Sequence, residues 1–307
     1  MAVMQTYELQ GKKLSFANWI SNLSPTETPF ITMTQKEAVD HTKFSWQTDT
    51  LNDIVTHAHV EGSDALDAEA VMNPTTVLNG YTQILRRVVK VSDTANMLAS
   101  YGRGREVPYQ LEKAGLAIKR DLEAILLSDQ VGDAGSPTTP RKAGSFQGLV
   151  APLNAVMPGT GAVIHFESAA SGVIDFADIR KMTYNIYLAN SKANIIMFHP
   201  KHAITFSALQ ETNGQTKLFD GDEKTFSYYV NTYIDEFGKE YKLVPNRFMP
   251  EDALYFFNSK DFTQMVLRAP QRIKLAKEGS FEQWMIEMEV GLRLDNPFSA
   301  GVIKAKA

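Results

Sequence analysis

The chain has 307 residues, of which 44% are hydrophobic and 21% charged, with a formal net charge of −4 and no cysteine. This composition supports one large domain or two smaller ones and argues against a disordered chain. The acidic balance argues against tight binding of free nucleic acid, which usually needs a basic excess. The lack of cysteine excludes disulfides, thiol catalysis and cysteine-ligated metals.

No stretch of the chain approaches the roughly 20 apolar residues of a membrane helix. The polar start, Met1–Lys13, has no apolar run of the length found in signal peptides. We therefore expect a protein that is made and kept in the cytoplasm of its producing cell, without a membrane partner.

The first forty residues do not resemble a compact domain. Two prolines four positions apart restrict the backbone, and Leu14–Leu23 before them can form a short amphipathic helix. Large apolar side chains here are costly to leave in water, which favours an arm that docks on a neighbouring subunit over a frayed terminus. The residues expected to make this contact are Trp19, Ile20, Pro25, Pro29 and Phe30.

Residues 41–93 have the pattern of a long two-stranded excursion. Phe44 and Trp46 alternate with polar residues, and the return run Thr75–Asp93 is rich in β-favouring residues. The intervening Leu51–Pro74 contains no Lys or Arg, but it contains Asp53, Glu61, Asp64, Asp67 and Glu69. A loop this long is uncommon unless it is functional, and a lone hairpin is marginally stable. We expect it to lean on a partner chain.

A small basic cluster, Arg86, Arg87 and Lys90, falls on the predicted return strand. Such a cluster is commonly a solvated face, and isolated surface ion pairs contribute little. The alternative is a dock for an acidic surface of a neighbour. The acidic residues of the hairpin tip, Glu61, Asp64 and Asp67, supply such a surface.

The clearest helix is Arg105–Ser128. Apolar residues recur along it at spacings of three and four, while charges such as Lys119 and Glu123 are expected mostly on the other faces. Pro108 is acceptable in its first turn. Asp129–Gln147, rich in Gly, Ser, Thr and Pro, is expected to be an exposed loop.

A second region starts near Val173. Asp175 is a plausible N-cap for a helix, Asn194–Phe198 suits a buried strand, and a helix with Ile204 and Phe206 available for packing should follow His199 and Pro200. The remaining chain is mostly strand-like. Its clearest strand, Trp284–Val290, has a period of two that places Met285, Glu287 and Glu289 on the face opposite Trp284, Ile286, Met288 and Val290. The fold class is therefore α+β.

The search for chemistry yields no catalytic, cofactor or metal site. His57 and His59, with Asp53 and Glu61 nearby, could hold a metal, but two polar residues on a solvated loop are far commoner. Gly102 and Gly104 lack the third glycine and the βαβ unit of a dinucleotide loop, so a hinge before the long helix explains them better.

Three motifs in order resemble the major capsid proteins of tailed phages, which share the Hong Kong-phage-type coat fold. The first is Ser24-Pro25-Thr26-Glu27-Thr28-Pro29-Phe30, and the second is Phe44-Ser45-Trp46-Gln47-Thr48-Asp49 followed by Glu61-Gly62-Ser63-Asp64-Ala65. The third is Phe237-Gly238, then Val244-Pro245-Asn246-Arg247-Phe248-Met249-Pro250, then Glu289 to Pro297. The resemblance covers nearly the whole chain.

This resemblance implies a fold with an N-terminal arm, an extended hairpin loop, a spine helix, and peripheral and axial domains. The expected bounds are 1–40 for the arm, 41–93 for the extended loop, 94–172 for the peripheral domain with the spine helix at about 105–128, 173–250 for the axial domain, and 251–307 for the return to the peripheral domain.

The resemblance also implies self-assembly into pentamers and hexamers of an icosahedral virion shell, formed in the host cytoplasm around double-stranded DNA that it contacts weakly. Some relatives carry a cleaved helical segment before the arm. We expect no such segment in this chain and therefore expect a separate scaffolding protein, with a portal and decoration proteins as further partners. The lysine-free Leu51–Pro74 predicts no covalent crosslink from the tip. The alternatives are an encapsulin-type compartment shell and a soluble enzyme with an unrecognised site.

Overall fold

The structure is a computed structural model, and it describes residues 24–51, 58–64, 73–98, 104–206 and 232–306. The chain divides into two compact units. The smaller unit contains Arg86–Ile118 and Arg272–Ile286, and the larger contains Glu27–Leu85, Lys119–Gln271 and Glu287–Ala307. Four elements contribute residues to both units: β4 (Gln83–Ser92), α3 (Glu106–Leu127), β10 (Phe262–Lys274) and β11 (Phe281–Leu294).

A mixed six-stranded sheet forms the centre of the larger unit. Its strands in spatial order are β5 (His165–Ser171), β12 (Gly301–Lys306), β9 (Ala253–Phe257), β6 (Ile195–Phe198), β8 (Glu240–Pro245) and β7 (Thr232–Ile234). The β5–β12 and β6–β8 pairs are parallel, and the other pairs are antiparallel. Every residue of β6 and β9 is buried, which confirms the strand predicted at Asn194–Phe198.

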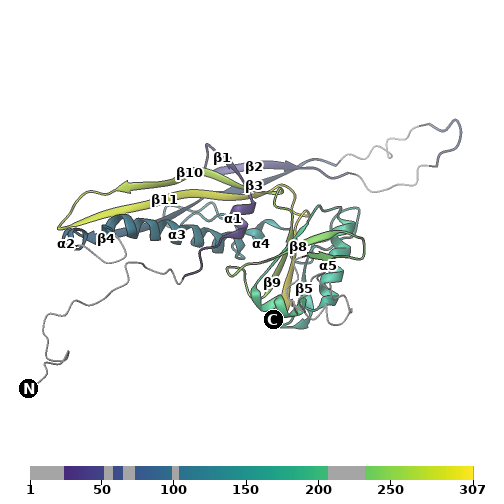
Figure 1. The fold of residues 1–307 in the computed structure, drawn as a ribbon. Helices are drawn as coiled ribbons and strands as arrows, with labels where there is room; N and C mark the ends of the chain where they lie inside the picture. Colours follow the sequence, from purple (N-terminus) through teal and green to yellow (C-terminus); the bar gives the residue numbers. More distant parts are fainter. Residues whose placement is uncertain (1–23, 52–57, 65–72, 99–103, 207–231, 307) are drawn as a thin grey trace, which may run out of the picture. The chain divides into compact units, whose positions relative to one another are not determined.

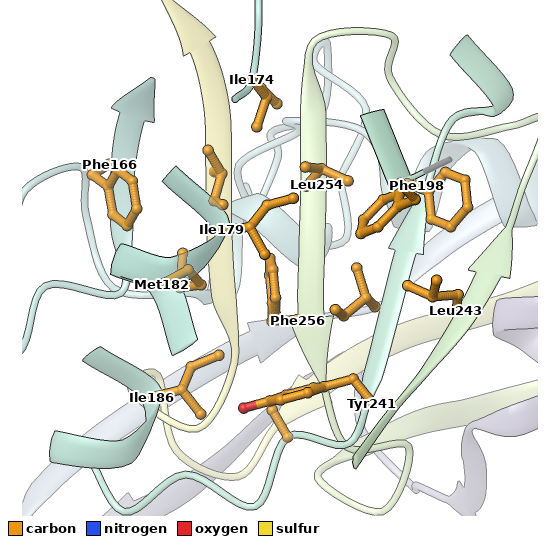
Figure 2. Packing of buried hydrophobic residues seen from close by; sticks show 14 residues of the cluster. Phe166, Ile174, Ile179, Met182, Ile186, Phe198, Tyr241, Leu243, Leu254 and Phe256 are labelled. Atoms are coloured by element: carbon orange, nitrogen blue, oxygen red, sulfur yellow. The ribbon is translucent and has the colours of Figure 1, made fainter. Parts of the chain in front are cut away.

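Helix α5 (Phe176–Leu188) packs on this sheet (Figure 1). It begins after Asp175 as predicted, and the Asp175 N–H donates to the Asp178 carboxylate at 3.2 Å. Figure 2 shows Ile179, Met182 and Ile186 of the helix beside Phe256 of β9. These residues recur at three- and four-residue spacing, so one face of the helix supplies the core.

The segment after β6 differs partly from expectation. It opens with a 3₁₀ turn, Pro200–His202, and Phe206 is buried as predicted. Ile204, however, is 78% exposed, so the prediction that it packs into the core is wrong. Residues two positions apart on a helical turn point to opposite sides, and the core lies on the side of Phe206.

The second large sheet has four strands in the order β1 (Gln35–Ala38), β10 (Phe262–Lys274), β11 (Phe281–Leu294) and β4 (Gln83–Ser92). Strand β1 is parallel to β10, with Gln35 opposite Thr263. Residues 35–38, which were predicted to belong to the arm, are therefore part of this sheet.

A separate two-stranded sheet joins β2 (Lys43–Thr48) to β3 (Thr76–Tyr81) in antiparallel register (Figure 1). The run Thr75–Asp93 was predicted to be one return strand, and this is wrong. It is divided at Thr82 into β3 and β4, which belong to different sheets. The basic residues Arg86, Arg87 and Lys90 therefore lie on β4 and not on the hairpin.

The long helix α3 spans Glu106–Leu127, which confirms the predicted Arg105–Ser128 within one residue at each end. Val107, Leu111, Ile118 and Leu122 are buried, as their spacing predicts. The remaining α-helices are short: α1 (Pro29–Met33), α2 (Asp93–Met97) and α4 (Phe146–Leu149). Among the described residues, the helices are too short or too polar to span a membrane.

A cluster of aromatic rings within the larger unit includes Phe30 of α1. Phe30 lies edge-on to Phe257 and Phe262, each at 5.6 Å between ring centroids, and to Phe146 at 6.1 Å. Phe30 is fully buried, so the prediction that it contacts a neighbouring subunit is wrong. The reason is that Pro29 begins α1, which seats the ring in the core of its own chain. Pro25 is half-buried, and Trp19 and Ile20 lie outside the described residues.

Candidate assembly surfaces

The two-stranded hairpin of β2 and β3 is tightly packed at its base. The ring of Phe44 lies against Gly80 and Gly291, where a Cβ atom would come within 2.3 Å and 2.7 Å of ring carbons. Only glycine permits this approach at both positions. Phe44 also stacks on Trp46, with ring centroids 5.9 Å apart. The base of the hairpin is therefore held by a close-packed contact with β11.

Thr82, between β3 and β4, is fully buried and bonded through each of its polar groups. Its N–H donates to the Thr42 carbonyl at 3.0 Å, and its hydroxyl donates to the Glu289 carboxylate at 2.8 Å. Its carbonyl accepts from Nε of Arg141 at 2.6 Å. Arg268 donates to the other Glu289 oxygen at 3.0 Å. We call Thr82, Arg141, Arg268 and Glu289 the hinge network, because they fix the point where β3 of the hairpin ends and β4 begins.

Glu289 lies on the face of its strand opposite Ile286 and Met288, and it is buried, with 3% of its surface exposed. Burial alone would raise the pKa of its carboxyl group. Hydrogen bonds from Thr82 and Arg268, and the charges of Arg141 and Arg268, outweigh burial and hold the pKa below its ordinary value. A period-two pattern could not reveal a partner such as Arg141, which is 148 positions away.

The described part of the hairpin tip, residues 58–64, is exposed throughout. A turn closes it, in which the Ser63 N–H donates to the Val60 carbonyl at 3.0 Å and Gly62 has φ +82°. The loop Leu51–Pro74 has no Lys or Arg, so it supplies no Lys or Arg cation to pair with Glu61 or Asp64. Val60 is 81% exposed. Asp67 lies outside the described residues.

The basic cluster is exposed on β4. The ammonium group of Lys90 lies 3.6 Å above the centre of the Phe281 ring on β11, while Arg86 and Arg87 are exposed beside it. Near these residues is an open groove of about 660 Å³, lined by residues 88–92, Ala95, Leu98, Glu106 and Gln110. No sequence pattern predicted this groove.

Glu123 was expected on an outer face of the long helix, and this is wrong. The side chain is fully buried, and its two oxygens accept from the N–H groups of Phe30 and Ile31, both at 2.8 Å. The side-chain amide of Asn246 donates at 2.7 Å. Burial raises the pKa of Glu123, and these hydrogen bonds offset only part of that effect. Glu123 thus joins α1, α3 and the segment after β8.

An exposed aromatic patch on α5 also escaped the sequence analysis. Tyr187 stacks on Phe237 with ring centroids 4.5 Å apart, and Tyr184 lies 6.4 Å from the same ring. All three side chains are exposed, and an ion pair between Arg180 and Glu236 borders them. The signal was available, because Tyr184 and Tyr187 occupy the α5 face opposite its buried residues.

Histidines of the described residues make backbone contacts. His165 Nδ1 lies 2.9 Å from the Ala151 carbonyl, and His202 Nε2 lies 2.8 Å from that of Glu251. Burial lowers the pKa of both. His199 Nδ1 accepts from the Lys201 N–H at 3.3 Å, so His199 caps the 3₁₀ turn Pro200–His202. No group of three or more potential metal ligands occurs among the described residues, and His57, Asp53 and Gly102 lie outside them.

Comparisons with known proteins agree with one another. The SU10 major capsid protein family matches residues 3–307. A relative described as the major capsid protein of Escherichia phage Phieco32 is 50% identical, covering 97% of this chain and 95% of the relative.

Solved structures share the fold at low identity. The capsid of an empty GTA particle has a TM-score of 0.69 at 13% identity and covers 100% of both chains. The SrpI encapsulin of Synechococcus elongatus PCC 7942 has a TM-score of 0.60 at 11% identity, covering 100% of this chain and 96% of that one. Solved phage capsids share it as well. The fold is thus the Hong Kong-phage-type coat fold.

Proposed function

Because this chain belongs to the SU10 major capsid protein family, we propose that it assembles as pentamers and hexamers of an icosahedral shell around double-stranded DNA. Membership of this family makes it a shell-forming phage protein and not an enzyme. The observation that carries the proposal is the 50% identity to a phage major capsid protein over nearly the whole of both chains. The extended hairpin agrees with it, because its exposed apolar residues have no core of their own to enter.

The family fold suggests roles for the elements. We assign α3 as the spine helix and the six-stranded sheet with α5 as the axial domain. The axial domain then includes β5, β9 and β12 besides the expected 173–250, so only part of 251–307 would return to the peripheral domain. The extended loop comprises β2, β3 and the residues between them, and so ends at Thr82 rather than at the earlier expected 93. The arm comprises the residues before α1.

The hairpin tip supports the proposed contact with a neighbouring copy. Glu61 and Asp64 are exposed acids, and Arg86 and Arg87 are exposed bases on β4. Opposite charges on two surfaces of one chain favour its self-association, chiefly through orientation and rate of encounter. Trp19, Ile20 and Pro25 remain proposed arm contacts. Asp67 and Lys90 remain proposed members of the acidic and basic surfaces, respectively.

The alternative role of a compartment shell with enzyme cargo shares the fold, since an encapsulin has a TM-score of 0.60 and the solved phage structures have TM-scores of 0.59 to 0.64. Fold likeness alone therefore does not separate the two roles. The sequence relationship favours the virion, because the 50% identical relative is a phage major capsid protein.

Several partners belong to this proposal. They are packaged DNA held by weak non-specific contact, a separate scaffolding protein, a portal and decoration proteins, with assembly in the host bacterial cytoplasm. The formal net charge of −4 supports only weak contact between shell and DNA.

The test is electron microscopy of particles from cells that express the chain with and without its phage's other structural proteins. We expect closed shells with five-fold vertices, and nucleic acid inside particles from infected cells. Particles that contain an enzyme and no nucleic acid would favour the compartment role. Denaturing gels of intact shells should show no covalent ladder, because Leu51–Pro74 contains no lysine.

A further inference from the structure

The groove in the smaller unit lies along the edge of a sheet. Its lining includes five consecutive residues of β4, 88–92, although successive side chains of a strand point to opposite faces. A groove that touches all five therefore runs along the backbone edge of β4 and not over one face of the sheet. In the described part of the chain, β4 is the end strand of its sheet and pairs with β11 alone. Its outer edge thus has room for a further strand.

The backbone of β4 points hydrogen-bonding groups into this groove. The N–H and C=O groups of an extended strand are directed alternately to its two edges. Directly after β4, the Asp93 N–H donates to the Ser280 carbonyl at 3.2 Å, on the side of β11, which begins at Phe281. Counting back along the strand, the backbone groups of Val88 and Lys90 point away from β11. An extended peptide laid along this edge would exchange hydrogen bonds with both residues, as in other cases of strand addition.

The side chains along this edge match an apolar residue and an acid. Val88 and Lys90 are exposed on one face of β4, since residues two apart in a strand share a face. Leu98, which lines the groove from just after α2, is 64% exposed. The carboxylate in the lining, Glu106, accepts from the side-chain amide of Gln110 at 2.6 Å. A partner strand with an apolar side chain opposite Val88 and an acid opposite Lys90 therefore fits this edge.

The charge of the smaller unit also favours an acidic partner. Its described residues include eight Lys and Arg residues but five Asp and Glu residues, whereas the whole chain has a net charge of −4. A positive surface on an otherwise acidic protein attracts a negatively charged partner and orients it during encounter.

Segments of this chain fit the edge poorly. The first 23 residues contain Lys12 and Lys13 but only one acid, Glu8, so the arm is basic. Strands β2 and β3 contain no Asp or Glu and already pair with each other. The acidic hairpin tip closes in a turn, with φ +82° at Gly62, and is not an extended strand there. The matching segment therefore belongs to another protein.

We propose that the outer edge of β4 accepts an extended acidic segment of a different protein as an added strand, hydrogen-bonded to Val88 and Lys90. The segment carries a β-branched residue opposite Val88 and a carboxylate two positions away, opposite Lys90. The inference goes beyond the proposed function, because it adds a docking edge for a protein that is not a copy of this chain. Arg86 and Arg87 lie outside the groove lining, so this edge is separate from the contact proposed for the hairpin tip.

The test uses the full, unassembled chain and a synthetic peptide, Thr-Asp-Thr-Val-Thr-Asp-Thr, with capped ends and a fluorescent label. Its pattern reads the same in both directions, so it fits β4 in parallel or antiparallel pairing. Fluorescence anisotropy should show saturable binding with a dissociation constant below about 1 mM. The matched peptide with Lys in place of both Asp residues should bind about tenfold more weakly. Absence of binding by the acidic peptide, or equal binding by the two, would overturn the inference.

N-methylated peptides separate strand addition from simple attraction of charge. Only every second N–H of an added strand faces β4, so methylation of one alternate set should weaken binding by about tenfold or more. Methylation of the other set should have little effect. The sensitive set is Val and Asp for antiparallel addition and Thr for parallel addition. Equal effects of the two sets would contradict an added strand.

A variant of the chain tests the same edge. Val88→Pro removes an N–H that points into the groove and spares pairing with β11, because proline is accepted on edge strands. It should bind the acidic peptide about fivefold more weakly than Val88→Ala, and equal binding would refute the proposal. Circular dichroism checks folding, and if Val88→Pro does not fold, the methylated peptides on the unaltered chain decide.

Two further results separate the possible occupants and the two proposals. Tighter binding by a peptide that copies residues 2–13 than by the acidic peptide would overturn the inference, because the arm would then occupy the edge. Shell formation is scored independently by electron microscopy. Normal shells without peptide binding would leave the proposed function standing and remove this inference alone.

Discussion

Two glutamates of the larger unit, Glu123 and Glu289, are both buried, but their carboxylates accept hydrogen bonds from different kinds of donor. Glu123 receives neutral donors, two backbone N–H groups and one amide, and its pKa lies above the ordinary value. Glu289 receives a hydroxyl and two guanidinium groups, and its pKa lies below it. Neutral donors thus do not compensate for burial of the charge, whereas cations do.

The two sites also differ in what they connect. Glu123 binds the first turn of α1 to the long helix, and both partner groups are inside the core. Glu289 binds the point where the hairpin begins, and its arginine partners are 24% and 44% exposed. Loss of Glu123 therefore leaves buried hydrogen-bond donors without an acceptor, whereas loss of Glu289 leaves arginine side chains that can turn towards water.

The largest effect is expected from Glu123→Ala. It leaves the Phe30 and Ile31 N–H groups and the Asn246 amide without acceptors, which should lower the free energy of unfolding by about 4 kcal/mol. Urea unfolding of the unassembled subunit measures it. Glu123→Gln is the matched variant and should cost less, because one carbonyl oxygen remains. A loss below about 1 kcal/mol for Glu123→Ala would show that water replaces the carboxylate.

Glu289→Ala should lower the free energy of unfolding by less, about 2 kcal/mol, because the Arg141 and Arg268 side chains are partly exposed and stay hydrated. Its distinctive result concerns assembly. The hairpin should lose its fixed direction, so shell yield should fall more than stability predicts. The control is a core variant, Ile303→Val or Leu254→Ala, whichever is measured to lose the same free energy of unfolding. Comparing its shell yield with that of Glu289→Ala separates the effect on hairpin direction from the effect on stability. Equal yields would refute a hinge role.

The pH dependence should have opposite signs at the two sites. The folded pKa of Glu289 is depressed, so its contribution is present above the ordinary value of 4.5 and is lost as the pH falls through the lower folded value. The folded pKa of Glu123 is raised, so the folded chain keeps a proton that the unfolded chain loses, and stability from this group grows as the pH falls towards 4.5.

Unfolding from about pH 7 to pH 4 should show this contrast. The advantage of the unaltered chain over Glu289→Gln should shrink at the acidic end of this range and below, whereas its stability relative to Glu123→Gln should rise. Parallel curves for the two glutamine variants would contradict the assignment of partners.

The smallest effect is expected at an exposed pair. Lys201 and Glu251 approach to 3.7 Å with both side chains mostly exposed. Glu251→Ala should change the free energy of unfolding by about 0.5 kcal/mol or less, since solvent screens the pair. This variant sets the baseline for the two buried glutamates, and an effect as large as that of Glu289→Ala would undo the comparison.

Local pattern predicted much of the fold. The long helix was located within one residue at each end, and the strand before Phe198 and the cap at Asp175 were correct, because each depends on neighbours in sequence. The division at Thr82 was missed, since β3 and β4 are equally rich in β-favouring residues and only distant partners separate them.

Burial of charge was also missed at both glutamates. A helical period cannot reveal that residues 30–31 fold back over Glu123, and a strand period cannot reveal Arg141 beside Glu289. The hairpin tip was correctly expected to be acidic and base-free because composition suffices for that. The groove was not predicted, since it is formed by segments that meet only in the folded smaller unit.

The pairing of the start of the chain has a consequence for synthesis. The side chain of Gln264 donates to the Ile31 carbonyl at 2.9 Å across 233 positions, and β1 pairs with β10. Contacts between such distant residues form late, because the ribosome must first release the second partner. The segment around α1 therefore cannot take its final place on a nascent chain until most of that chain exists.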